Sequence, residues 1–521
     1  MNKEILKYCF KEGILLDNEV LNLLNEANDL AVAKLLISKI KEQTQQKIIT
    51  KETFYNKEVV EGLFSGLPSQ NRNLEKLKIK LGLSIEISKE TQQPPQEIIK
   101  VSKDKPRIKV LSSTPPPLNQ RIEVNDFVTH FRNRFLEMRV FLQDHQGLDN
   151  LVSINKISGS KHNLSVIGLV SERKITKNKN LIFEVEDLTG KIRILVRKDK
   201  KELYERAEEI ALDSVIGIKG SGNREIIFVN ELALPGAHLP RRKNSPQDES
   251  ILFIGDLHFG SKRFLEKSFK KFIRYLSDEN SEDPEVAKIN YLFIVGDVVT
   301  GVGNYPNQER DLLIKDLEEQ FSGFAELLKE IRRDIKIIIS PGNHDGVRLM
   351  EPQPIFDEKF AWALHEMENV ILVENPSYLN IGSVNEFSGF DVLAHHGFSL
   401  PYYANSVPRL LSSRAMNTPE EIMKYILVNR HLAPTHASAQ YFPLNKDPLI
   451  IRVVPDIFVS AHSHKSAVSY YNNILVISVS SWEGFTPYQE KFGNIPDHCK
   501  VPMFNLKTRS VKILDFETEE N

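Results

Sequence analysis

Short apolar runs that stop abruptly at a His, Asp or Asn residue most constrain how this chain can fold. The clearest run covers residues 335–339, stops at a Ser-Pro-Gly sequence and is followed at once by Asn343, His344 and Asp345. A β-branched run that stops at Pro-Gly predicts a buried strand reaching the edge of a sheet. Asn-His-Asp is also an ordinary turn sequence, so this stretch alone does not establish a site.

Four further apolar runs within residues 244–521 end in the same way, and helix-length segments separate them. This alternation predicts an α/β domain. Ligands of open α/β sheets bind at the carboxyl ends of the strands, so side chains at these ends are expected to share one site. The side chains at the four strand ends are Asp256 and His258, Asp297, His395 and His396, and His462 and His464.

The composition is that of a globular, intracellular protein. The chain has 521 residues, 41% of them hydrophobic and 26% charged, which gives a prior of roughly three domains. Cys9 and Cys499 are the only cysteines, so a disulfide framework is excluded. The apolar runs fall short of the ~20 residues that a membrane span needs, and the N-terminus lacks a signal peptide's apolar stretch. We therefore expect a cytoplasmic protein without membrane association.

The N-terminal part predicts a small helical module followed by a linker. Within residues 1–67, apolar residues such as Leu6 and Phe10 recur at helical spacing. This pattern favours a helical bundle that mediates contacts and has no chemistry of its own. Residues 68–120 contain proline clusters and many lysines but few aromatic residues, which predicts a flexible linker.

Residues 121–243 predict a helix followed by an OB-fold barrel. Phe127, Phe131 and Phe135 recur at helical spacing, and five strand-length runs follow, with a short helix between the third and fourth. This order fits an OB-fold. The barrel could bind single-stranded DNA or contact another subunit. Its basic loop lacks interleaved aromatic residues for base stacking, and a net charge of −2 gives no overall attraction to DNA. Both roles remain open.

The strand-end residues of the α/β domain could bind two divalent metal ions. Two ions about 3.5–4 Å apart can polarise a phosphoryl oxygen, generate hydroxide and stabilise a leaving oxygen. Asp297 stands alone at its strand end and is the candidate bridging carboxylate. The mixed oxygen and imidazole donors favour manganese first, with iron, zinc or magnesium as alternatives. Two pairs are spaced so that their side chains can converge on such ions: Asp256 with His258, and His462 with His464.

His344 is the candidate general acid. It follows the ligand candidate Asn343 and is placed to donate a proton to a leaving alkoxide. Asp345 could fix the orientation of its imidazole. The sequence therefore predicts His344 and Asp345 as catalytic residues beside the metal ligands.

The order of these residues resembles that of the calcineurin-like metallophosphoesterases. Asp-x-His, Gly-Asp, Gly-Asn-His-Asp, His-Gly and His-x-His follow one another across roughly residues 250–485. The resemblance implies a two-sheet sandwich with flanking helices. It also implies two metal ions with a shared carboxylate: one ion held by Asp256, His258 and His464, the other by Asn343, His396 and His462, and Asp297 between them.

Histidines outside this set are expected to have packing roles. The family ligand is the histidine next to glycine, which selects His396 over His395. Ala461 stands where the family usually has glycine, so a positive φ there would strain the backbone and disturb His462. Structural or exposed positions are also expected for His365, His431, His436 and His498.

A narrower resemblance covers nearly the whole chain. Residues 341–354, 430–434, 454–457 and 481–489 are similar to those of the small subunits of archaeal D-family DNA polymerases. That family joins a helical module and an OB-fold to the phosphoesterase, so the resemblance implies a multidomain α+β protein. It further implies a 3′–5′ exonuclease that proofreads single-stranded or mismatched DNA, with a large catalytic subunit as partner. The N-terminal module would recruit another replication protein.

Two functions from different classes follow from these features. The complete set of ligand types favours a nuclease subunit. The near-neutral charge and the weak aromatic content of the barrel instead keep open a non-catalytic scaffold that supports the large polymerase subunit. A phosphodiesterase of small nucleotides is disfavoured by the additional barrel and helical module.

Overall fold

The computed structural model describes residues 2–17, 20–21, 34, 37–38, 48–49, 108–112, 121–277 and 283–518. The chain divides into two compact units, residues 1–101 and 102–521. No helix among the described residues is both long and apolar enough to cross a membrane.

The first unit contains a helix and a small strand pair. Helix α1 (Asn2–Glu12) buries Ile5 and Cys9, which lie one turn apart. Strands β1 (Leu15–Leu16) and β2 (Ile48–Ile49) pair in parallel, which the sequence did not predict. Of the other helices expected in residues 1–67, the structure describes only the helical residues 20–21, 34 and 37–38.

A closed five-stranded barrel follows in the second unit. Leu181 and Phe183, two residues apart, are both buried, because alternate side chains of a strand point to the same face. Asp187 closes the next turn by accepting N–H bonds from Thr189 and Gly190 at 2.7 and 3.0 Å. In barrel order the strands are β4 (Lys161–Ile175), β5 (Leu181–Asp187), β6 (Gly190–Val196), β8 (Ile226–Ala233) and β7 (Val215–Gly222), with α7 (Lys201–Glu208) between β6 and β7 in the chain.

Helix α6 (Val124–Gln143) joins the barrel to the C-terminal domain. On its buried face, Phe135 and Leu142 pack with Ile167 of the barrel and with Ile450. The helix was predicted from its apolar spacing, and the structure shows that this apolar face is covered within the chain itself.

A buried ion cluster strengthens this junction. Arg134 of α6 is fully buried and donates to Asp447 at 2.6 Å and to the Pro434 carbonyl at 2.5 Å. His431 Nε2 lies 3.0 Å from the same Asp447 carboxylate. Burial alone would raise the pKa of Asp447, but Arg134 and His431 hold it well below its usual range. His431 thus has the structural role expected from the sequence.

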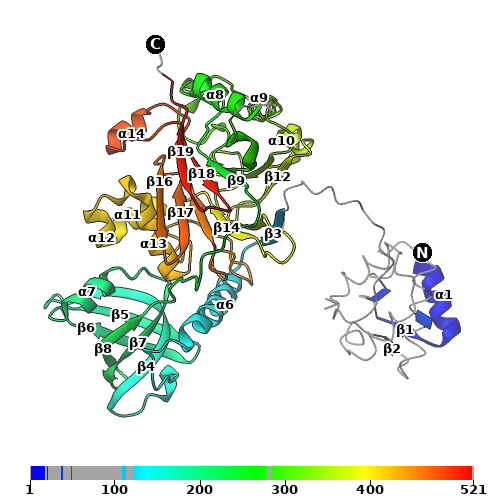
Figure 1. Ribbon diagram of the computed structural model, residues 1–521. Helices are drawn as coiled ribbons and strands as arrows, with labels where there is room; N and C mark the ends of the chain where they lie inside the picture. Colours follow the sequence, from blue (N-terminus) through cyan, green and yellow to red (C-terminus); the bar gives the residue numbers. More distant parts are fainter. Residues whose placement is uncertain are drawn as a thin grey trace. The chain divides into compact units, whose positions relative to one another are not determined.

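Two six-stranded sheets form the C-terminal domain (Figure 1). In order across the first sheet, the strands are β12 (Val370–Leu372), β11 (Lys336–Ser340), β10 (Ile289–Val295), β9 (Ser250–Ile254), β18 (Lys500–Asn505) and β19 (Val511–Asp515). In order across the second sheet, they are β16 (Ala467–Tyr471), β17 (Ile474–Ser478), β15 (Ile457–Ser460), β14 (Phe390–His395), β13 (Ser377–Ile381) and β3 (Ile108–Ser112).

The two sheets pack face to face with helices on their outer faces. Phe253 and Phe293 of the first sheet share a core with Val392 and Ile477 of the second. Helices α8 (Glu266–Ser277), α9 (Leu317–Leu328) and α10 (Glu358–His365) cover the outside of the first sheet. Helices α11 (Leu400–Ser406), α12 (Pro408–Ser412) and α13 (Pro419–Asn429) cover the outside of the second. Helix α14 (Pro487–Phe492) precedes β18.

Strand β3 corrects one prediction. It lies within residues 68–120, which the sequence predicted as a flexible linker, yet it pairs antiparallel with β13 at the edge of the second sheet. These five residues therefore belong to the sandwich. The rest of the predicted linker lies outside the described residues.

The parallel strands end together. β9, β10 and β11 are parallel neighbours, with Ile254 opposite Ile294 and Ile294 opposite Ile339. β14 and β15 are likewise parallel in the second sheet. All five apolar runs predicted as strands are therefore strands, and those of each sheet end at a common edge.

Candidate metal centre

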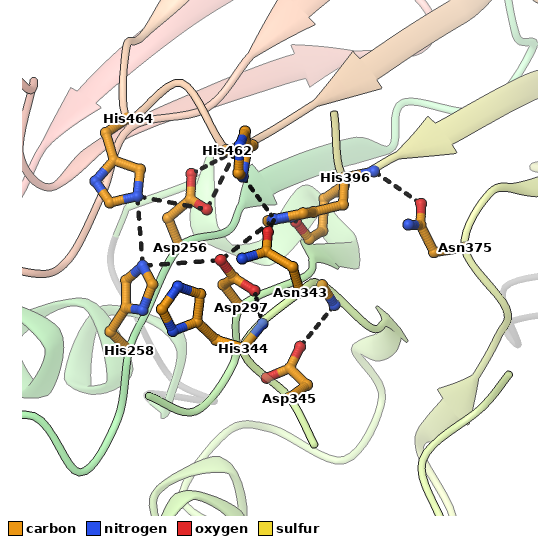
Figure 2. A network of polar contacts seen from close by, with 12 residues as sticks. Asp256, His258, Asp297, Asn343, His344, Asp345, Asn375, His396, His462 and His464 are labelled. Carbon is orange, nitrogen blue, oxygen red and sulfur yellow. Dashed lines mark hydrogen bonds and ion pairs between the residues drawn. The ribbon is translucent and has the colours of Figure 1, made fainter. Parts of the chain in front are cut away.

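Polar side chains from five strand ends converge at one place (Figure 2). The structure brings together every residue that the sequence predicted as a metal ligand. They are Asp256 and His258 after β9, Asp297 after β10, Asn343 after β11, His396 after β14, and His462 and His464 after β15.

The donor atoms lie close enough to share metal ions. His258 Nε2 and His464 Nε2 are 3.3 Å apart, and His396 Nε2 is 3.2 Å from Asp297 Oδ2. His396 Nε2 is also 3.0 Å from Asn343 Oδ1. Three groups have donor atoms within 4.8 Å of one another: Asp256, His258 and His464; Asp297, His396 and His462; and His258, Asp297 and His344. The first two groups consist of predicted ligands, and the third also contains His344.

Five of these residues have a left-handed backbone. Such a conformation costs roughly 1–2 kcal/mol for a residue with a side chain, and it concentrates at functional sites. A positive φ at Ala461 would have strained the backbone there. In the structure, the neighbouring residue His462 has the positive φ instead. The five residues, with φ between 48° and 65°, are Asp256, His258, Asp297, His462 and His464.

Two glycines allow the loops to approach this closely. A Cβ on Gly342 would lie 2.3 Å from Asp297 Oδ1, and one on Gly296 would lie 2.4 Å from His396 Nδ1. Both distances are far below van der Waals contact. The glycines of the Gly-Asp and Gly-Asn-His-Asp motifs are therefore required by the packing of the centre.

Burial and the Asp297 carboxylate control the charges of the imidazoles. It lowers the pKa of His258 to about 3 and also lowers those of His462 and His464. Burial would lower the pKa of His396 too, but the Asp297 carboxylate raises it to about 10. In return, against the effect of burial, His396 holds the pKa of Asp297 well below its usual range. Neutral imidazole nitrogens 3.3 Å apart, with carboxylates beside them, fit divalent cations, whose binding would displace the proton between His396 and Asp297.

Residues outside the predicted set hold the ligands in place. His396 Nδ1 lies 3.1 Å from the Val295 carbonyl, and its backbone N–H donates to Asn375 at 2.8 Å. Gln489 Nε2 lies 2.8 Å from His464 Nδ1. Such contacts orient ligands and tune metal affinity. These residues were not predicted from the sequence; only Gln489 carried a signal, because Thr486 and Gln489 form a capping box at α14.

His344 lies in the centre, but its surroundings differ from those predicted. Its backbone N–H donates to Asp297 at 2.7 Å, and its Nδ1 lies 3.1 Å from the Thr300 carbonyl. The two oxygens of Asp345 accept the backbone N–H bonds of Val299 and Gly342 at 2.9 and 2.7 Å. The contact that orients the imidazole is thus the Thr300 carbonyl, and Asp345 holds the loop beneath it.

His395 packs beside the centre. It is fully buried, and its Nε2 lies 2.9 Å from Glu351. This contact agrees with the packing role expected for it.

The Asp345 carboxyl, which holds the loop of His344, has a pKa raised to about 7. Burial is the largest cause, and the charge of Asp297 is the second.

The chain is similar to known proteins. The calcineurin-like phosphoesterase family matches residues 249–466. The chain is 33% identical over 398 residues to the DNA polymerase II small subunit of Methanothermobacter thermautotrophicus, which covers 76% of this chain and 80% of that protein. It is 35% identical over 407 residues to the small subunit of Pyrococcus furiosus, a match that covers 76% of this chain and 64% of that protein. It is 33% identical over 411 residues to the small subunit of Thermoplasma acidophilum, a match that covers 77% of this chain and 80% of that protein.

Proposed function

This chain belongs to the family of archaeal DNA polymerase II small subunits and has a calcineurin-like phosphoesterase domain, and from this premise we propose that it proofreads for a two-subunit replicative polymerase. The proposed reaction is metal-dependent 3′–5′ exonucleolytic hydrolysis of single-stranded or mismatched DNA. The observation that supports it is the convergence of carboxylates, an amide and imidazoles from five strand ends.

The residues divide into metal ligands and a proton donor. When bound, two divalent ions, manganese by preference, would supply the positive charge that stabilises phosphoryl oxygens and makes water acidic. Hydrolysis joins a water oxygen to phosphorus, with release of a water proton to solvent, and breaks the P–O3′ bond, whose electron pair stays on the 3′ oxygen. His344 donates a proton to that oxygen. The products are a 5′-nucleotide and a shortened strand with a 3′ hydroxyl. The proposed ligands are Asp256, His258 and His464 for one ion and Asn343, His396 and His462 for the other, with Asp297 shared.

Polymerisation is assigned to the large catalytic subunit. In the described part of the chain, the groups of acidic and histidine donors all belong to the one centre, so a second, polymerising carboxylate site is not evident there. We propose that the barrel is an OB-fold and that it contacts the large subunit or DNA. On α6, Val128, Leu136 and Val140 remain exposed and offer an apolar stripe for such a contact.

A non-catalytic scaffold is the alternative function. The near-neutral net charge of −2 supports it, because little general attraction to DNA follows from it. In either case we propose that the N-terminal module, residues 1–67, recruits another replication protein, and that the protein works in the cytoplasm on the nucleoid.

One experiment separates the two functions. Full-length protein is incubated with 5′-labelled single-stranded DNA and manganese, with and without chelator. The exonuclease predicts a ladder of products shortened from the 3′ end, abolished by the chelator and restored by manganese. An unchanged substrate at every manganese concentration, also in the presence of the large subunit, would support the scaffold.

A further inference from the structure

The imidazole of His344 is held in one orientation by backbone. Its Nδ1 lies 3.1 Å from the Thr300 carbonyl oxygen. A carbonyl oxygen can only accept a hydrogen bond, so Nδ1 must carry the hydrogen and donate it. Among the described residues, the polar contacts of this ring fall on Nδ1, which leaves Nε2 for the substrate.

The side-chain amide of Asn304 bonds to two backbone carbonyls, that of Thr300 and that of His344 itself. Its Nδ2 donates to the Thr300 carbonyl at 3.1 Å and to the His344 carbonyl at 3.1 Å. Both acceptors are backbone oxygens, so the orientation of the amide is determined. With its two hydrogens used in this way, Nδ2 rests against the edge of the imidazole, 3.3 Å from Nδ1. The amide therefore connects the loop after β10 to the loop after β11.

The loop that carries Asn304 is itself well supported. The backbone N–H of Asn304 donates to Gln308 Oε1 at 2.8 Å, and the side chain of the buried Gln308 donates to the Thr300 carbonyl at 2.9 Å. Gly301 has φ +70°, and a Cβ there would lie 2.0 Å from the His344 carbonyl oxygen and 2.4 Å from Asn304 Nδ2. The two loops thus meet at a position where only a glycine fits.

We propose that Asn304 is a positioning residue for His344 in phosphodiester hydrolysis. This inference rests on the proposed function, in which His344 gives a proton to the leaving oxygen as the P–O bond breaks. A sugar alkoxide is strongly basic and needs that proton. A p-nitrophenolate leaving group is weakly basic and departs without it. Loss of Asn304 should therefore slow cleavage of DNA and leave cleavage of bis(p-nitrophenyl) phosphate nearly unchanged.

The test compares both substrates in full-length protein with manganese. For Asn304→Ala we expect kcat on single-stranded DNA to fall roughly 10- to 100-fold, since misplacing a catalytic group by about 1 Å can cost ~10²-fold. KM on DNA, metal content and the rate on bis(p-nitrophenyl) phosphate should stay within about two-fold, since none of them depends on the proton donated to the leaving oxygen. Leu has a shape similar to that of Asn but no hydrogen-bond donors, so Asn304→Leu should show the same changes as Asn304→Ala. Asn304 is exposed, so this second variant should also fold.

Asn133→Ala is the matched control. Its exposed amide donates to the Asn445 carbonyl at 2.7 Å, the same kind of bond in α6. It should leave both rates unchanged. Equal losses on both substrates in the Asn304 variants, or an unchanged rate on DNA, would overturn the positioning role. Hydrolysis of neither substrate by the unsubstituted protein would overturn the proposed function itself.

Discussion

Asp297→Asn tests the shared carboxylate on which the proposed metal centre depends. Asp297 is 1% exposed, and one of its oxygens accepts the backbone N–H of His344 at 2.7 Å. The other oxygen lies 3.2 Å from His396 Nε2. Asn has nearly the same shape and can still accept the backbone bond. The substitution therefore removes one negative charge from a buried site with little change in packing.

That charge contributes to the binding of both ions. At about 4 Å and an effective dielectric constant of about 20, a carboxylate and a doubly charged ion attract each other by about 8 kcal/mol. Much of this is offset by the lost hydration of the two charges. A remainder of about 2 kcal/mol would weaken each ion's binding about 30-fold. Because the carboxylate serves both ions, the expected loss for the pair is about 10³-fold, and nuclease activity should be lost with it.

Metal content and exonuclease rate are measured on the same samples, by mass spectrometry and with 5′-labelled single-stranded DNA. Asp316→Asn is the matched control, because Asp316 caps α9 by accepting the Glu319 N–H at 3.0 Å and Asn caps helices equally well. Two bound ions and full manganese-dependent activity in Asp297→Asn would refute the assigned centre. Chelation of the unsubstituted protein should reproduce the effect and be reversed by manganese.

The other predictions concern proton donation, the junction and the partner. His344→Ala should keep both ions and cleave DNA about 10²–10⁴-fold more slowly; loss of metal would instead make His344 a ligand. Asp447→Ala should lower the free energy of unfolding by about 3–5 kcal/mol, because the buried Arg134 loses its counter-charge; a calorimetric change below about 1 kcal/mol would contradict this. Since the pKa of Asp447 is held low, its contribution is present above about pH 4 and is lost as the pH falls through the lower folded-state value. A chain starting at residue 102, which keeps β3, should coelute with the large subunit in size-exclusion chromatography; separate elution would place the interface in residues 1–101.

Local sequence was sufficient to predict the strands and the side chains at their ends. Asp256, Asp297 and Asn343 each lie within a few residues of a buried apolar run. The run predicts the strand, and the residues next to it predict the chemistry. Parallel strands of one sheet end at the same edge, so these short signals also predicted that the side chains would meet.

The apolar spacing of α6 predicted a helix, while the partners of its buried side chains could not be predicted. Arg134 pairs with Asp447, which lies 313 residues further along the chain. A helical period reports which side chains share a face, and it contains no information on what covers that face. The same limit explains β3, whose pairing with β13 joins residues more than 250 positions apart.

Only the tertiary structure decided what holds the candidate catalytic and metal-binding groups in place. The sequence assigned the orientation of His344 to its neighbour Asp345, but the contact is made by the carbonyl of Thr300. Asn375 bonds to the backbone of His396, and it precedes that residue by 21 positions without any periodic signal. These contacts arise because the close packing of loops brings distant polar groups within bonding distance, and each buried polar group must then find a partner. Residue type and local spacing identify the groups that bind and react, and the packing of distant loops determines their orientation.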